Sequence, residues 1–342
     1  MRLRHLLAFL VLLAVPSLAW HAPDEGPLEW NARAVEHLMN RAGFGARPGE
    51  LERWGEAGPE AAVEELLAPR AWAEPPVVRV HRPDKRRLRA LSPDERRSII
   101  NAARRADRSQ TRAHLVGWTT SMLRGEAPLL DRMTLFWHGV FTSQVSKVQA
   151  SHEMIGQHLL LRDHALGNYG GLLREVLRDP AMLVYLDNDE SDIARPNENL
   201  ARELLELFSL GEGNYSETDV LETARALTGH GVDRRRGYVF DPEAHDGGPK
   251  VVLGISGPLD LDDVVDAILE QPACARYVVG RIIEYLEGVP PGPDRLERFA
   301  QLLRDCDYEL EPVLRALFLD PAFYRPEVVG ARVLSPVDYL VG

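Results

Sequence analysis

The segment Arg195-Pro-Asn-Glu-Asn-Leu-Ala-Arg-Glu-Leu-Leu-Glu-Leu-Phe-Ser-Leu-Gly211 carries the clearest helix signal of the chain. Asn197 can cap a helix that begins at Glu198, and Gly211 can end it after about four turns. With about 100° between successive residues, the side chains that share the apolar face are Leu200, Ala201, Leu204, Leu207 and Phe208. Those that share the polar face are Glu198, Asn199, Arg202, Glu203, Glu206 and Ser209. The segment therefore predicts an amphipathic helix that packs its leucines into a helical core.

Three charged residues of the polar face follow one another at four-residue spacing. Glu198, Arg202 and Glu206 stand at i, i+4 and i+8, so the arginine lies between two carboxylates. Such a ladder is either a structural ion-pair network or the floor of a binding site, and both interpretations stay open. His37 and Arg41 stand together at the same spacing on an N-terminal helix, and we place them in the same structural class.

Helical periodicity with helix-start signals recurs along most of the chain. A capping box at Ser92–Glu95 opens a long helix towards Arg124. The pattern changes at residues 229–259, which are rich in glycine and contain the short β-prone runs Tyr238–Phe240 and Val251–Leu253. We predict one all-α, multi-helix domain over residues 20–342, with an irregular or short β-hairpin insertion at about 229–259. Residues 69–91, rich in Pro and Arg and without periodicity, are expected to form a surface linker inside it.

The first residues have the composition of a secretory signal peptide. Arg2 and Arg4 precede the apolar run Leu6–Val15, and Ser17-Leu18-Ala19 offers small residues at a cleavage site. The apolar run is well short of the roughly 20 residues that span a bilayer, and no later segment reaches that length. We expect residues 1–19 to be removed and the mature protein to be exported to the periplasm or the cell exterior, without a membrane span.

The charge of the chain is unevenly distributed. The formal charge is −12 over 342 residues, yet residues 79–112 hold 12 Lys/Arg against 4 Asp/Glu, a local charge of +8. The overall acidity argues against nucleic-acid binding as the main task. On the long helix, the arginines within about 100° of one another are Arg97, Arg104, Arg105, Arg108 and Arg112. This stripe is either a solvated face paired with nearby acids or an edge that binds an anionic ligand at Arg97, Arg104, Arg108 and Arg112.

Two cysteines, Cys274 and Cys306, would reach an oxidising compartment if the protein is exported. They could form a disulfide or remain buried thiols, and no metal-ligand spacing involves them.

Several long motifs in a fixed order give the chain a family resemblance. They are His37-Leu-Met-Asn-Arg41-Ala-Gly-Phe-Gly45, Met133-Thr-Leu-Phe-Trp-His138, Asp179-Pro-Ala-Met-Leu-Val-Tyr-Leu-Asp187, Pro196-Asn-Glu-Asn-Leu-Ala-Arg-Glu-Leu-Leu-Glu-Leu-Phe208, Asp219-Val-Leu-Glu-Thr-Ala-Arg-Ala-Leu-Thr-Gly229 and His245-Asp-Gly-Gly-Pro-Lys250. From about residue 30 to its end, the chain resembles the bacterial domain-of-unknown-function 1800 family. The resemblance implies an exported, mainly helical protein with no established activity. It also implies a partner, since family genes often stand beside genes for an exported sulfatase-like protein of the domain-of-unknown-function 1501 family.

The chain departs from the family pattern in three places. Relatives usually have a second histidine where Val140 stands and a tryptophan where His230 stands. They also continue past Gly342, so we expect a short form that lacks the C-terminal part of the family pattern. If the paired histidines serve a metal, the valine at position 140 removes one of its ligands in this chain.

The candidate chemistry falls on His138, the Glu198–Glu206 ladder and His245-Asp246. Imidazole and carboxylate groups are ligands for divalent metals, and carboxylates also act as general acids and bases. The metal-ligand candidates are His138, Glu198, Glu203 and His245, and the acid–base candidates are Glu203, Glu206, His245 and Asp246. Each has a structural alternative, namely a satisfied core histidine or a buried ion pair. The loop at His245-Asp246 has the weakest structural explanation.

Two classes of function remain open. The first is an accessory or binding module that acts with an envelope or extracellular partner. The second is a metal- or carboxylate-assisted hydrolase or oxidase, with a divalent metal ion as its cofactor. This second class predicts that His138, Glu203 and His245 face one cavity. We favour the first class, because the valine at position 140 and the early end of the chain both remove parts that an enzyme would need.

Overall fold

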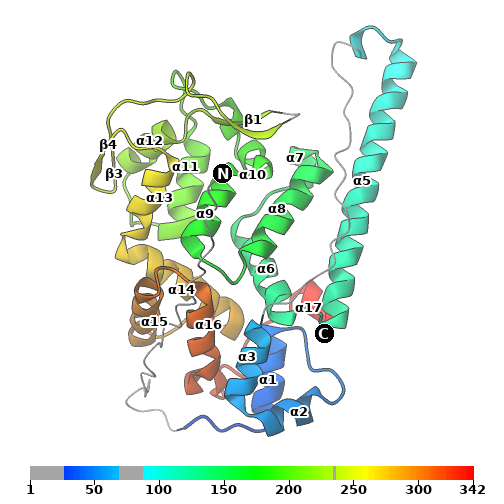
Figure 1. Cartoon of the computed structure of the whole chain (residues 1–342), viewed down its shortest axis with the longest axis vertical. Helices are drawn as coiled ribbons and strands as arrows, with labels where there is room; N and C mark the ends of the chain where they lie inside the picture. The colour runs from blue at the N-terminus through cyan, green and yellow to red at the C-terminus, as the bar shows by residue number, and fades with distance from the viewer. Residues whose placement is uncertain (1–26, 69–87, 234–235) are drawn as a thin grey trace, which may run out of the picture.

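The computed structural model describes residues 27–68, 88–233 and 236–342. The expected signal peptide at 1–19 and most of the expected linker at 69–91 lie outside the described residues. The first part of the described chain is helical throughout (Figure 1). Its helices are α1 (Ala32–Ala42), α2 (Glu50–Ala57), α3 (Pro59–Leu67), α5 (Pro93–Arg124), α6 (Pro128–Val140), α7 (Val145–Val148) and α8 (Ser151–Asp163).

The second part of the described chain is also mainly helical. It comprises α9 (Tyr169–Arg178), α10 (Pro180–Tyr185), η1 (Asn188–Glu190), α11 (Glu198–Glu203), the π-helical segment η2 (Leu204–Leu210), α12 (Glu217–Ala226), α13 (Leu261–Leu269), α14 (Pro272–Glu287), α15 (Pro293–Asp305), α16 (Leu310–Leu319), η3 (Pro321–Tyr324) and α17 (Pro336–Val341). The all-α prediction is therefore confirmed.

The insertion between α12 and α13 consists of two small antiparallel hairpins. In the first, β1 (His230–Asp233) pairs with β2 (Gly237–Phe240), with His230 opposite Phe240. In the second, β3 (Lys250–Val252) pairs with β4 (Ile255–Gly257). The two β-prone runs of the sequence are both strands, but each pairs with its nearest neighbour in the chain rather than with the other.

One large hydrophobic cluster joins the two parts of the chain. It runs from Val35 of α1 to Phe323 of η3. Within it, two helix pairs begin side by side, because Asn168 before α9 and Glu309 before α16 form an antiparallel bridge. Asp179 and Asp320 occupy equivalent places in these pairs, since each ends one helix and caps the next. The tripeptide Asp-Pro-Ala, which occurs at residues 179–181 and 320–322, thus marks two similar helix junctions.

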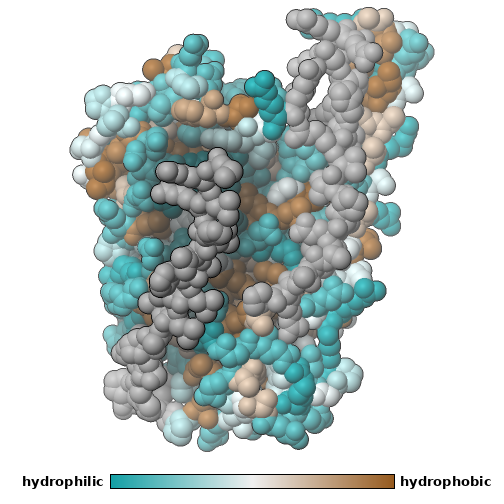
Figure 2. Space-filling model, in the orientation of Figure 1, coloured by the Kyte–Doolittle hydropathy of each residue, from teal (hydrophilic) through white to brown (hydrophobic). Residues whose placement is uncertain are grey.

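The 32-residue helix α5 is the most extended element (Figure 1). Its C-terminal part contacts α6, α8 and α17, while its N-terminal end reaches beyond its neighbours. The helix carries seven arginines and three acids, a net charge of +4 in a chain of −12. Figure 2 shows that hydrophobic residues also reach the surface along this edge of the molecule. Among the described helices, none is both long and apolar enough to cross a membrane.

Candidate functional site

The central helix changes its hydrogen-bonding pattern at Leu204. Residues Glu198–Glu203 are α-helical and Leu204–Leu210 are π-helical, and the amide of Gly211 donates to the Glu206 carbonyl oxygen, five residues back. A π-helical stretch turns the following side chains away from the positions that an α-helix gives them. The predicted faces are therefore wrong after Leu204. Leu207 is 46% exposed rather than inside, and Ser209 is buried rather than on the polar face.

Side chains from distant elements hold the π-helical segment. The hydroxyl of Tyr169 donates to the Phe208 carbonyl oxygen (2.6 Å), and the hydroxyl of Tyr277 donates to that of Leu207 (2.8 Å). Carbonyl groups at a helix end need such donors. Gly211 ends the segment with a φ of 79°, and a Cβ there would lie 2.8 Å from the Tyr277 ring. Only glycine fits this turn without displacing Tyr277.

The expected Glu198–Arg202–Glu206 ladder is only half formed. Arg202 lies 3.4 Å from Glu198, but it makes its closest contacts, at 2.8 and 2.9 Å, with Glu217 of α12. Glu206 instead accepts a hydrogen bond from the Tyr215 hydroxyl at 2.6 Å. The ladder is an exposed surface feature, since the Arg202 side chain is 38% exposed. Arg202 thus forms an exposed ion pair rather than a buried one, and its nearest partner, Glu217, comes from another helix.

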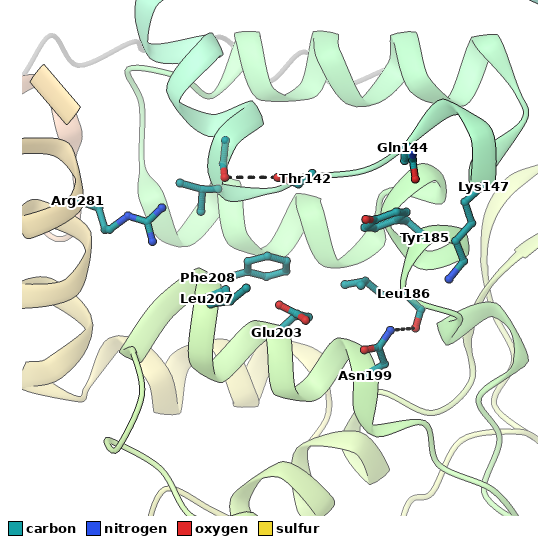
Figure 3. Close-up of a pocket in the computed structure, with 12 residues that line it drawn as sticks. Thr142, Gln144, Lys147, Tyr185, Leu186, Asn199, Glu203, Leu207, Phe208 and Arg281 are labelled. Atoms are coloured by element: carbon teal, nitrogen blue, oxygen red, sulfur yellow. Dashed lines mark hydrogen bonds between the residues drawn. The ribbon is translucent and has the colours of Figure 1, made fainter. Parts of the chain in front are cut away.

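A cavity of about 610 Å³ lies between α6, α10, α11, η2 and α14 (Figure 3). Its wall includes Glu203 from the end of α11 and Leu207 and Phe208 from η2. Arg281 reaches it from α14 on one side. Val140 lines the same cavity. We call this cavity the α11 pocket.

Glu203 and Arg281 bring opposite charges to the α11 pocket. The Glu203 carboxylate is half-buried and has no hydrogen-bond or ion-pair partner among the described residues. Burial, and then repulsion from Glu206, raises the pKa of Glu203. The Arg281 guanidinium donates through Nη1 to the Tyr277 hydroxyl (2.9 Å), and no carboxylate of the described chain lies within ion-pair distance of it. The four-residue spacing of Tyr277 and Arg281 on α14 indicates that these two side chains meet, but not that Arg281 reaches this pocket.

On the far side of the pocket, the charged side chain of the wall already has a partner of opposite charge. Lys147 binds Asp187 at 2.8 Å and lies 5.5 Å from the centre of the Tyr185 ring. The side-chain amide of Asn199 donates to the Leu186 carbonyl oxygen at 3.2 Å (Figure 3). These contacts leave Glu203 and Arg281 as the two charged groups of the pocket wall that have no charged partner within the described chain.

His138 lies outside this pocket wall, in a cluster of aromatic rings between α5, α6 and α8. Its Nε2 is 3.0 Å from Nδ1 of His158, and the His158 ring centre lies 4.6 Å from that of His114. Trp118 packs against both His138 and His158. Burial, and then the charge of His114, lowers the pKa of His138 to about 4, so the ring is neutral. The three histidines come from three helices, so sequence spacing does not show that they meet.

The loop at His245-Asp246 is held by local contacts. His245 donates through Nδ1 to the Thr228 carbonyl oxygen at 2.9 Å, and Asp246 accepts from Arg225 at 2.7 Å. Lys250 is buried and donates to the carbonyl oxygens of Gly248 and Leu259, both at 3.0 Å, and to that of Asp246. These contacts give the motif a structural role, which is to fasten the glycine-rich loop to the end of α12.

The metal-ligand candidates thus occupy different surroundings. His138 lies in the histidine cluster, Glu203 in the α11 pocket and His245 against Thr228. Within residues 27–68, 88–233 and 236–342, no three His, Cys, Asp or Glu residues form a group that could hold a metal ion.

The remaining structural candidates also have partners of their own. His37 contacts the Phe323 carbonyl oxygen at 2.9 Å, and Arg41 donates to that of Val328 at 3.1 Å, so both brace the C-terminal segment rather than each other. Cys274 and Cys306 are free thiols, and burial raises the pKa of Cys274 to about 12.

Comparison with known proteins supplies a family and no activity. No curated protein and no solved structure matches the chain. The model of a family described as a protein of unknown function, DUF1800, matches residues 37–342. The match includes α11, η2 and every described residue that lines the α11 pocket. The chain therefore belongs to the DUF1800 family.

Proposed function

We propose that the protein is an exported binding module that holds a small polar ligand in the α11 pocket. The observation that carries the proposal is the pair Glu203 and Arg281, opposite charges that share one pocket and lack charged partners in the described chain. Partly buried charges without partners are unfavourable in a folded protein. Groups of this kind in a concave pocket are typical of ligand sites.

The π-helical segment supports this proposal. It forms part of the pocket wall through Leu207 and Phe208, and π-helical turns are frequently found at functional sites. Tyr277 binds both this segment and Arg281, so the same contacts hold the wall and the guanidinium in place before a ligand arrives.

A hydrolase or oxidase has less support from the geometry. Hydrolysis by paired carboxylates needs two of them in one site. Of the described residues that line the pocket, only Glu203 carries a carboxylate, and Glu206 is bound to Tyr215 instead.

A second surface supports the accessory role. Arg97, Arg104, Arg105, Arg108 and Arg112 are all exposed on α5. We propose that this stripe binds an acidic surface of an envelope or extracellular partner, of which the sulfatase-like family named above is the one implied by resemblance. Arg104→Glu with Arg108→Glu should then weaken capture of that protein, and capture that is unchanged at low salt would remove the stripe from this role.

Two glycines provide a matched test of the pocket. A side chain at Gly139 would enter open space in the pocket, and one at Gly156 of α8 would enter open space outside the pocket wall. Gly139→Phe should abolish the thermal stabilisation that a bound small molecule produces, whereas Gly156→Phe should preserve it. A ligand that stabilises both variants equally binds elsewhere, and the proposal would then be wrong.

Export has its own test. Cleavage after Ala19 predicts a mature N-terminus at Trp20. N-terminal sequencing of protein from the producing cells should find it, and an intact Met1 on a cytoplasmic form would contradict export.

A further inference from the structure

The two unmatched charges of the α11 pocket do not bind each other. Glu203 comes from α11 and Arg281 from α14, and they are not within ion-pair distance of one another, although both line the cavity. Figure 3 shows the guanidinium at one side of the pocket and the carboxylate nearer its middle. The two charges therefore line one cavity without neutralising each other.

Arg281 is positioned to bind an anion. Its Nη1 is engaged by the Tyr277 hydroxyl, and its guanidinium carbon lies 5.6 Å from the centre of the Tyr277 ring. Tyr277 is in turn fixed by the Leu207 carbonyl and by its close packing on Gly211. The remaining N–H groups of a guanidinium held in this way suit a carboxylate, which accepts two parallel hydrogen bonds.

Glu203 is positioned to bind a cation. Its carboxylate is half-buried beside Glu206 and lacks a donor among the described side chains. An ammonium group from a ligand would supply both the missing charge and the missing donor. Lys147 does not supply this ammonium group, because it forms an ion pair with Asp187.

Leu207 and Phe208 lie between the two charged groups (Figure 3). Leu207, Phe208 and Val140 line the pocket together with Glu203 and Arg281. Such a lining favours methylene groups over hydroxyl groups in the middle of a ligand.

We propose that the ligand of the α11 pocket is a zwitterion, with a carboxylate bound to Arg281, an ammonium group bound to Glu203 and an apolar spacer over Phe208. The inference rests on the proposed function, because it requires that the pocket binds a small molecule. A simple anion would leave Glu203 unmatched, and a simple cation would meet Arg281. An ω-amino acid, free lysine and the C-terminal lysine of a peptide share the chemistry that fits both, a carboxylate and an ammonium group joined by methylenes.

The test uses a series of ω-amino acids against ligands with a single charge. Glycine, 4-aminobutyrate, 6-aminohexanoate and 8-aminooctanoate vary the spacer, while hexanoate and hexylamine each keep one charge. Calorimetric titration of the mature protein at pH 7 should give one preferred spacer length. Its affinity should be at least about tenfold above that of either single-charge control, the gain that one charge-assisted contact supplies. Free lysine and Nα-acetyl-lysine then separate a free amino acid from a peptide end.

Two variants assign the ends of the ligand. Glu203→Gln should abolish the advantage of the ω-amino acid over hexanoate without weakening hexanoate. Arg281→Gln should abolish its advantage over hexylamine without weakening hexylamine. Glu198→Gln, on the same helix but outside the pocket wall, should change neither.

The possible failures are distinguishable. If ω-amino acids bind no better than the single-charge compounds, or bind equally well to both charge variants, the zwitterion inference is wrong. If another compound, such as a dicarboxylate or an uncharged polyol, still binds in a way that Gly139→Phe abolishes, the proposed function survives that result. If every compound that binds is insensitive to Gly139→Phe, the proposed function and the zwitterion inference are both wrong.

Discussion

Glu203 and Glu198 stand on one helix but differ in surroundings, and that difference predicts different effects on stability. Burial raises the pKa of Glu203, so the folded state favours its protonated form, and stability is lost as pH rises through that pKa. Glu203→Gln resembles the protonated form. Its thermal midpoint should therefore exceed that of the natural protein at pH 7, with the gap closing towards pH 4. Glu198→Gln removes an exposed ion pair and should give no gain. A Glu203→Gln protein that is less stable at pH 7 would show that the carboxylate has a partner in solution.

Lys250 provides a residue-scale test of the loop at His245-Asp246. Its ammonium group holds three backbone carbonyls in a buried position, and removing a charged donor leaves those acceptors unsatisfied. Lys250→Met should lower the free energy of unfolding by about 2–4 kcal/mol, as measured by urea denaturation. Lys147→Met, which removes an exposed ion pair with Asp187, should cost less than about 1 kcal/mol. Equal losses would mean that the motif has no special structural role.

At the element scale, the features predicted correctly are those set by neighbouring residues. Ser92 caps α5 and Asn197 caps α11 as expected, because a cap depends on side chains within three residues of it. The π-helical segment could not be predicted, since Tyr169 and Tyr277, which hold its carbonyls, are distant in sequence. The contact of His138 with His158 and the position of Arg281 at the pocket could not be predicted for the same reason, since these residues meet partners from other helices. Local patterns thus specified the helices, and contacts between helices specified the site.

Gly211 connects the end of the π-helical segment to Tyr277. Gly211→Ala should destabilise the fold for two reasons. Alanine is strained in the left-handed backbone conformation of this position, and its Cβ would clash with the Tyr277 ring. Gly213→Ala is the matched control, because its φ is 83° and a Cβ there meets no described atom within 4 Å. The first variant should lose about 1–3 kcal/mol more than the second in urea denaturation. Similar losses would show that Tyr277 moves aside without consequence.

At the scale of the whole molecule, buried polar contacts join segments that are far apart in sequence. Arg132 of α6 binds Asp338 of α17, and both side chains are almost completely buried. Asp131, the preceding residue, binds Arg162 of α8 and the indole of Trp118 on α5. Breaking such a pair leaves an uncompensated buried charge. These contacts fasten α5 and α17 to the body of the protein, and the sequence gives no sign of them because each partner belongs to a different periodic pattern.

We expect the histidine cluster to make the attachment of α5 dependent on pH. Three neutral rings, His114, His138 and His158, meet between α5, α6 and α8 beside the Arg162–Asp131 pair. Burial lowers the pKa of each, to about 4 for His138, whereas an unfolded histidine titrates near pH 6.5. Below about pH 6.5 the histidines of the unfolded chain therefore bind protons, whereas those of the folded protein stay neutral. The free energy of unfolding falls as the pH is lowered, until the pH reaches the pKa of the folded protein.

His138→Gln isolates the contribution of one ring to this dependence. Glutamine does not titrate, so the variant escapes the loss that protonation of His138 imposes. At pH 7.5 the variant should be less stable than the natural protein, because it loses the packing against His158 and Trp118. At pH 4.5 the difference in unfolding free energy should shift by about 2–3 kcal/mol in favour of the variant, because the pKa of His138 is about 4 in the folded protein and near 6.5 in the unfolded chain. Urea denaturation at the two pH values measures this shift. A difference that stays constant between them would mean that His138 is already charged in the folded protein, and that the cluster is more open to water than its contacts indicate.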